Sequence, residues 1–160
     1  MAEEDALFAH LEELMEALPE MQRKGDALAK ARAAAEVAKR AHYLEGQQNE
    51  LDGILSAMEE HSQARDAAIA AGDAEAEEAH RAQILLLGNE RGIRKGAADA
   101  AQRELDQALS AGEFADIEAA HAAQLPEDEL ATLAAEVEAF QADYAETLAA
   151  CQAAEGVEEA

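Results

Sequence analysis

The feature that most constrains the fold is a strict heptad repeat in the last third of the chain. Apolar or small side chains recur there at alternating spacings of three and four residues: Leu130, Leu133, Val137, Phe140, Tyr144, Thr147 and Cys151. This spacing forms one stripe on an α-helix and is typical of helices that pack side by side in a coiled coil. The repeat therefore predicts a long helix, and we expect its first five members to form a core seam.

Composition alone points in two directions. Leu, Ile, Val and Phe supply only 28 of 160 residues, and with a net charge of -24 this scarcity is typical of disordered chains. Ala, Glu, Lys, Leu and Arg supply 99 residues, which is typical of long helices. The heptad repeat decides in favour of folded helices. Because 44 residues are alanine, we expect these helices to pack closely.

Proline and glycine mark the expected helix ends. Pro19 ends or kinks the first helix, and Pro126 opens the last one. Gly72 and Asp73 predict the turn of an antiparallel hairpin, in which glycine closes one helix and aspartate caps the next.

Residues 110–113, Ser-Ala-Gly-Glu, have the pattern of a capping box. This box predicts a short helix that reaches about Ala123. We expect Phe114 and Ile117 to face inward from it.

Residues 20–71 carry a second stripe of the coiled-coil type with one slip in register. Its members are Leu28, Val37, Ala41, Leu44, Gln48, Leu51, Leu55 and Met58. Two alternatives stay open, since the segment is either one helix or two helices that meet between Gly46 and Gly53. We therefore predict an all-α fold, an antiparallel bundle of about five helices, some of them long and coiled-coil-like. Residues 1–152 form one domain, and residues 153–160 form an acidic, frayed tail.

Glycine or alanine recurs at every fourth position from Gly88 through Gly92 and Gly96 to Ala100. On a helix these residues form a groove in which another helix can cross closely. A loop is the alternative, because each glycine costs a helix about 1 kcal/mol. The flanks are strongly helical and no proline intervenes, so the sequence favours a helix with an interface at these four residues.

Charge is unevenly distributed along the chain. Residues 104–160 contain fifteen acidic residues and no Lys or Arg, whereas residues 23–40 and 81–103 are net positive. Phosphate binding needs a basic surface, so we predict neither direct nucleic-acid binding nor binding to an anionic membrane. A protein with a basic surface is the expected partner, and a second copy of this chain is another. Docking of the two basic segments onto the acidic region is the internal alternative.

The longest run of large apolar residues, Ile84–Leu87, is far shorter than the ~20 residues of a membrane span. A single cysteine, Cys151, excludes an intramolecular disulfide and fits a reducing compartment. We therefore expect a cytoplasmic protein without a membrane segment.

Two Glu-x-x-His spacings, Glu77 with His80 and Glu118 with His121, are typical of helical carboxylate-bridged metal sites. Glutamate fills 26 positions, so chance also explains such spacings. Cys151 lies near the end of an acidic helix, where a thiol is expected to be inert. We therefore predict no catalytic, cofactor-binding or metal-binding residue.

These features predict a non-enzymatic helical module for protein interaction: an adaptor, chaperone or assembly scaffold. One alternative is an acidic mimic of nucleic acid that inhibits a DNA- or RNA-binding protein, and uniform rather than segregated charge would favour it. The other alternative is a carboxylate and histidine metal-binding bundle.

Overall fold

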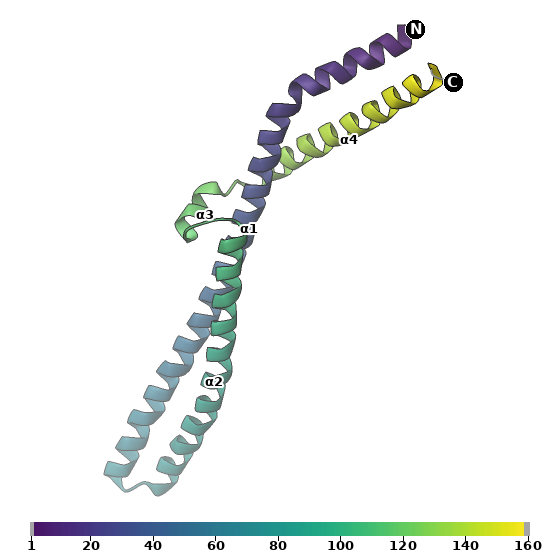
Figure 1. The fold of residues 1–160 in the computed structure, drawn as a ribbon. Coiled ribbons are helices and arrows are strands. Elements are labelled where there is room, and N and C mark those ends of the chain that lie inside the picture. Colours follow the sequence, from purple (N-terminus) through teal and green to yellow (C-terminus); the bar gives the residue numbers. More distant parts are fainter. Residues whose placement is uncertain (1, 159–160) are drawn as a thin grey trace. The chain divides into compact units, whose positions relative to one another are not determined.

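The computed structural model describes residues 2–158, which form four helices and no strand and are 94% helical. The helices are α1 (Ala2–Ala71), α2 (Ala74–Ala111), α3 (Ile117–Ala123) and α4 (Glu127–Glu158) (Figure 1). The predicted all-α class is therefore confirmed. The count is four instead of about five because α1 continues through Pro19.

Pro19 lies inside α1 and does not begin a new helix. Proline lacks the backbone N–H, and its ring clashes with the carbonyl of the residue four positions earlier, here Met15. A kink is the usual result, and α1 bends in its purple N-terminal part in Figure 1. Of the two open alternatives for residues 20–71, the structure shows one helix, with Gly46 and Gly53 in its interior.

The described chain divides into two compact units. Unit 1 combines Met1–Ala35 with Ala122–Ala160, and unit 2 is Glu36–His121. The single domain predicted for residues 1–152 stays a prediction. Of the predicted tail, residues up to Glu158 belong to α4, and residues 159 and 160 lie outside the described residues.

In unit 1 the first part of α1 pairs with α4. Leu7 contacts Cys151 and Lys24 contacts Glu136, so the two helices run in opposite directions. The residues of the heptad repeat in α4 lie at the contact with α1 or beside it. Those beside the contact are half-buried. Val137, Thr147 and Cys151 are buried, whereas Leu130, Leu133, Phe140 and Tyr144 are half-buried.

In unit 2, α2 returns along the second part of α1, and the two helices again run in opposite directions. Their contact is built from small and medium-sized side chains. Its buried members are Val37, Leu44, Ala68, Ala98, Ala101 and Leu105.

For two residues of α1 the predicted seam position is wrong. Gln48 is exposed and Leu55 is 43% exposed, whereas Gln47 and Ile54 are half-buried. Two heptad frames fit this stripe. Both contain Val37, Leu44, Leu51 and Met58, which are buried or half-buried, and they differ by one residue at the seam positions in between. The structure uses the earlier residue at 47/48 and at 54/55, whereas Arg40 and Ala41 are both half-buried.

The turn between α1 and α2 has the predicted form. Gly72 has a φ of 71°, the left-handed conformation that glycine adopts without a Cβ penalty. The Gly72 amide donates to the Ile69 carbonyl at 3.2 Å, and the Asp73 amide donates to the Ala68 carbonyl at 2.9 Å. This pair of bonds is a Schellman motif. Asp73 then caps α2, because its carboxylate accepts from the Ala76 amide at 3.1 Å.

The second turn differs from the predicted capping box. The Phe114 amide donates to Leu109 and the Glu113 amide to Ser110, so residues 110–113 close α2 and do not open α3. Glu113 takes the left-handed position with a φ of 57°. Asp116 caps α3 instead, accepting from the Ala119 amide at 2.7 Å. Phe114 is buried as predicted, but Ile117 is 46% exposed.

Replacement of Gly72 by alanine should destabilise the hairpin by about 1 to 2 kcal/mol, because alanine is strained at this positive φ. Gly53→Ala is the matched control, since Gly53 lies inside α1 and a methyl group there meets no atom within 4 Å. It should stabilise by about 0.5 to 1 kcal/mol. Urea unfolding of both variants measures the difference, and equal effects would contradict the turn geometry.

Phe140→Ala tests the core seam of α4. The ring is half-buried and stacks on Tyr144 with centroids 6.1 Å apart. We expect a loss of about 3 kcal/mol, the lower end for a large aromatic residue. Glu146→Ala, an exposed change on the same helix, should stay within about 0.5 kcal/mol. A loss below about 1 kcal/mol for Phe140→Ala in urea melts would remove this residue from the seam.

Candidate interaction surfaces

The glycines of the predicted groove lie in α2, so residues 88–96 are helix and not loop. A methyl group built on Gly88, Gly92 or Gly96 would meet no atom of the described chain within 4 Å beyond the adjoining backbone. No other described segment therefore crosses α2 at these glycines. Their role in a helix crossing stays a prediction, and it now concerns a second molecule. Ala100 differs from them, since it is half-buried and lines a groove with Tyr43 of α1.

A second, uncharged stripe runs along α2 on the side turned away from α1. We call it the outer face of α2, and its members are Ala82, Leu85, Leu86, Asn89, Gly92, Ile93 and Gly96. All seven are exposed. The largest are exposed to 71% at Leu85, 58% at Leu86 and 72% at Ile93.

The outer face follows the spacing of a heptad seam, as the inner face does. Ile84 and Leu87 point toward α1 and are half-buried, so Leu85 and Leu86 between them must point elsewhere. One face of a helix cannot bury four consecutive apolar residues. The run Ile84–Leu87 therefore indicates a second apolar face already in the sequence. The four-residue spacing predicts the glycines of this stripe but not its leucines and isoleucine.

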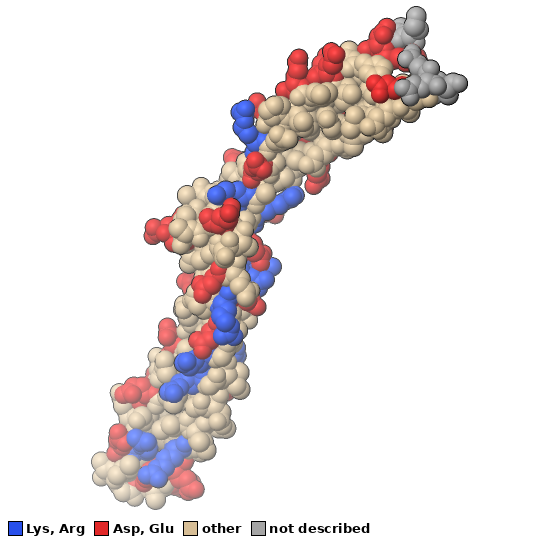
Figure 2. Space-filling model, in the orientation of Figure 1, with Lys and Arg blue, Asp and Glu red and all other residues tan. Residues whose placement is uncertain are grey.

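Acidic charge dominates one end of unit 1. The acidic end, as we call it, comprises residues 2–22 of α1 and 139–158 of α4, which together hold eleven acidic residues and no Lys or Arg. Figure 2 shows acidic side chains and no Lys or Arg on the visible face around the described ends of α1 and α4.

Bases of α1 neutralise part of α4. Lys24 binds Glu136, and Arg32 lies 3.8 Å from Glu138. The hydrogen bond with Glu136 raises the pKa of Lys24 above its ordinary value. Two bases of the segment 23–40 therefore contact α4, whereas Arg40 of the same segment binds Glu36 and Glu104. Glu146 and Glu155 lie in the part of α4 that pairs with the first 22 residues of α1, a segment without Lys or Arg.

The basic segment 81–103 is engaged mainly inside unit 2. Arg94 binds Glu50 of α1 at 2.7 Å, and Arg81 binds Glu77 one turn earlier at the same distance. These exposed pairs are individually worth about 0 to 1 kcal/mol.

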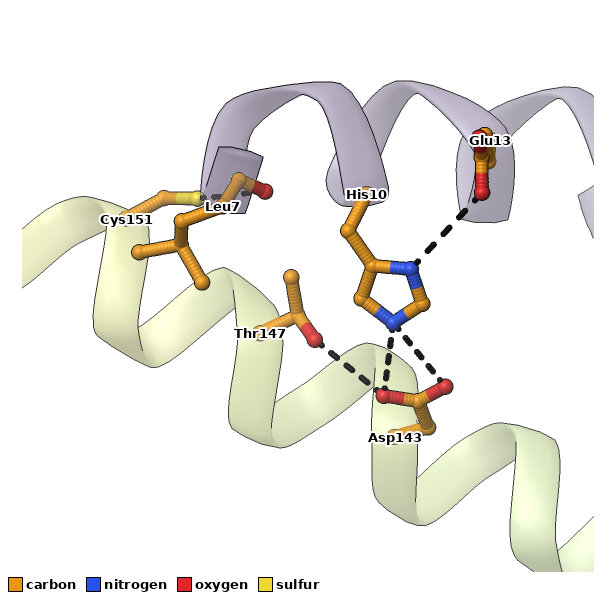
Figure 3. A network of polar contacts seen from close by, with 6 residues as sticks. All are labelled: Leu7, His10, Glu13, Asp143, Thr147 and Cys151. Atoms are coloured by element: carbon orange, nitrogen blue, oxygen red, sulfur yellow. Dashed lines mark hydrogen bonds and ion pairs between the residues drawn. The ribbon is translucent and has the colours of Figure 1, made fainter. Parts of the chain in front are cut away.

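A polar network joins α1 and α4 at the acidic end (Figure 3). His10 Nε2 lies 3.1 and 3.2 Å from the two carboxylate oxygens of Asp143, and Thr147 donates its hydroxyl to Asp143 at 3.2 Å. The Asp143 carboxylate thus lies between the Thr147 hydroxyl and the His10 ring. The network ties α1 to α4 at this end of unit 1.

Cys151 is only 3% exposed, and its thiol points to the Leu7 carbonyl at 3.8 Å. A buried thiol with this contact has a packing role.

The two Glu-x-x-His spacings are not brought together. His80 meets His61 of α1, with their Nδ1 atoms 2.9 Å apart, whereas His121 is exposed on α3. In the described part of the chain, no group of three or more His, Cys, Asp or Glu side chains is placed to hold a metal ion. No spacing in the sequence indicates the His61 and His80 pair, because it joins two helices across a turn.

None of the described helices combines the length and the apolarity that crossing a membrane requires.

Comparison with protein-family models, with curated proteins and with solved structures finds no match to this chain. The surfaces described above are therefore the basis for any functional assignment.

Proposed function

We propose that this protein is a non-enzymatic helical interaction module, an adaptor, chaperone or assembly scaffold that binds another protein. The observation that carries the proposal is the outer face of α2. Leu85, Leu86 and Ile93 expose large apolar side chains on a helix whose opposite face is already packed on α1. Contiguous exposed apolar surface of this kind is typical of protein-binding sites.

The outer face suits an amphipathic helix. Its members recur with heptad spacing, and Gly92 and Gly96 leave room for a second backbone to approach closely. We also infer that the helix pairs of both units are antiparallel coiled coils. The opposed helix directions and the alternating three- and four-residue seams support this inference.

The charge of unit 1 supports a partner with a basic surface. The acidic end holds eleven acidic residues and no Lys or Arg, so the bases of α1 at Lys24 and Arg32 leave its charge unmatched. Opposite charge steers a partner toward such a surface and fixes its orientation. The cytoplasm, the compartment expected from the sequence, remains part of this proposal.

Ile93→Asp tests the outer face. A charge there should abolish partner capture, because the carboxylate would be desolvated in the interface. Ile69→Asp is the matched control, since Ile69 is 50% exposed on α1 and lies outside the outer face. Wild type and both variants are compared by quantitative mass spectrometry of proteins captured from native lysate, with circular dichroism to verify folding.

Proteins lost with Ile93→Asp and kept with Ile69→Asp are the expected result. Retention of the same proteins by both variants would contradict the proposed interface. Light scattering on the purified proteins separates a second copy from another partner, because a homo-oligomer dissociates in the Ile93→Asp variant. Displacement of the captured protein by duplex DNA would instead favour the nucleic-acid mimic.

Salt dependence tests the acidic surface. We expect the melting temperature of the isolated protein to rise between low salt and about 0.5 M sodium chloride, because salt screens its self-repulsion. The double variant Glu146→Gln/Glu155→Gln should melt higher at low salt and respond less to salt. A clear decrease in the wild-type melting temperature would show that attraction in the ion pairs between α1 and α4 outweighs the self-repulsion. The acidic region would then serve the packing of this chain and not a partner.

A further inference from the structure

Two histidines face one another across the hairpin of unit 2. His61 lies on α1 and His80 on α2, and their Nδ1 atoms are 2.9 Å apart. The ring centroids are 5.2 Å apart, and the ring planes are inclined by 46°. Both side chains are half-buried, so the pair is held by its surroundings and still open to solvent.

This separation is suited to two nitrogen ligands of one metal ion. Zinc-to-imidazole distances are about 2.0 to 2.1 Å, so two such nitrogens lie about 2.9 Å apart at a right angle and about 3.3 Å apart at a tetrahedral angle. Without metal, one Nδ1 donates its proton to the other. When a metal binds, that proton can move to the Nε2 atom of the same ring, which leaves both Nδ1 lone pairs free.

We propose that His61 and His80 form a two-imidazole site for a borderline transition-metal ion such as Zn²⁺, linking α1 to α2 near the Gly72 turn. Imidazole favours Zn, Cu and Ni over Mg and Ca, which prefer oxygen ligands. Water completes the coordination shell, since the described residues offer no third ligand already in place. The site is independent of the proposed interaction function.

The fold holds both ligands in place before metal arrives. The turn at Gly72 and Asp73 connects the two helices and keeps the imidazoles at short range, so a second ligand follows the first at high effective concentration. Glu77 lies one turn before His80, but its carboxylate binds Arg81 at 2.7 Å. The site therefore depends on the two imidazoles and not on a carboxylate.

Calorimetric titration with Zn²⁺ tests this site on the full chain after chelator treatment. We expect one ion per chain and a loss of affinity of about tenfold or more in His61→Ala and in His80→Ala, because a single imidazole loses the chelate advantage. His42→Ala is the matched control, since His42 is an exposed histidine elsewhere on the same hairpin, and it should bind as wild type does. Excess Mg²⁺ in every titration occupies the carboxylates that hard cations prefer.

Equal Zn²⁺ affinity in wild type, His61→Ala and His80→Ala would overturn the proposal, as would complete competition by Mg²⁺. Circular dichroism shows whether each variant is folded, and His61→Gln and His80→Gln replace any alanine variant that is not. A second readout is the melting temperature, which Zn²⁺ should raise in wild type and in His42→Ala but not in the His61 or His80 variants. Electron paramagnetic resonance with Cu²⁺ should show coupling to two nitrogens in wild type and to fewer in either variant.

Discussion

Each unit depends on close contact between two antiparallel helices whose buried side chains are mostly small. Ala31 and Ala34 are buried in unit 1, and Ala98 and Ala101 are buried in unit 2. Alanine favours the helix and lets two backbones approach, but it removes little apolar area from water. Stability therefore has to come from many repeated contacts along long helices, and not from a few large core residues.

A two-helix contact also limits what can be buried. A helix with one neighbour covers one face, and every other face meets solvent. Charged side chains are spread over this solvent-facing surface (Figure 2), but the outer face of α2 contains none. Leu85 and Ile93 find no cover in their own unit, and the proposed interaction function rests on this exposure.

Sequence reasoning succeeded where the signal was local. Gly72 and Asp73 specify their turn through φ and capping, which involve only neighbouring residues. It failed where a choice depended on packing across helices. Leu55 lost its seam position to Ile54 because two frames fit the spacing equally, and only the facing helix decides between them. The His61 and His80 pair likewise required knowledge of the alignment of α1 with α2.

The left-handed conformation of Glu113 explains a third wrong prediction, the capping box at residues 110–113. Glycine usually takes this position in a helix-closing motif, and Gly112 stands one residue too early. The capping-box pattern matched the residue types but not the bonds that form.

The short connection at Gly72 fixes how the two helices of the hairpin are aligned along their length. The pairs Arg94–Glu50 and Arg40–Glu104 lie ten residues apart along both helices, so the alignment set at the turn is kept far from it. An alanine-rich seam looks similar at every level and resists sliding only weakly. A slip of one heptad would move one helix about 10 Å along the other, and a two-residue connection has no spare length for such a movement. The turn thus supplies the longitudinal alignment that the seam itself specifies poorly.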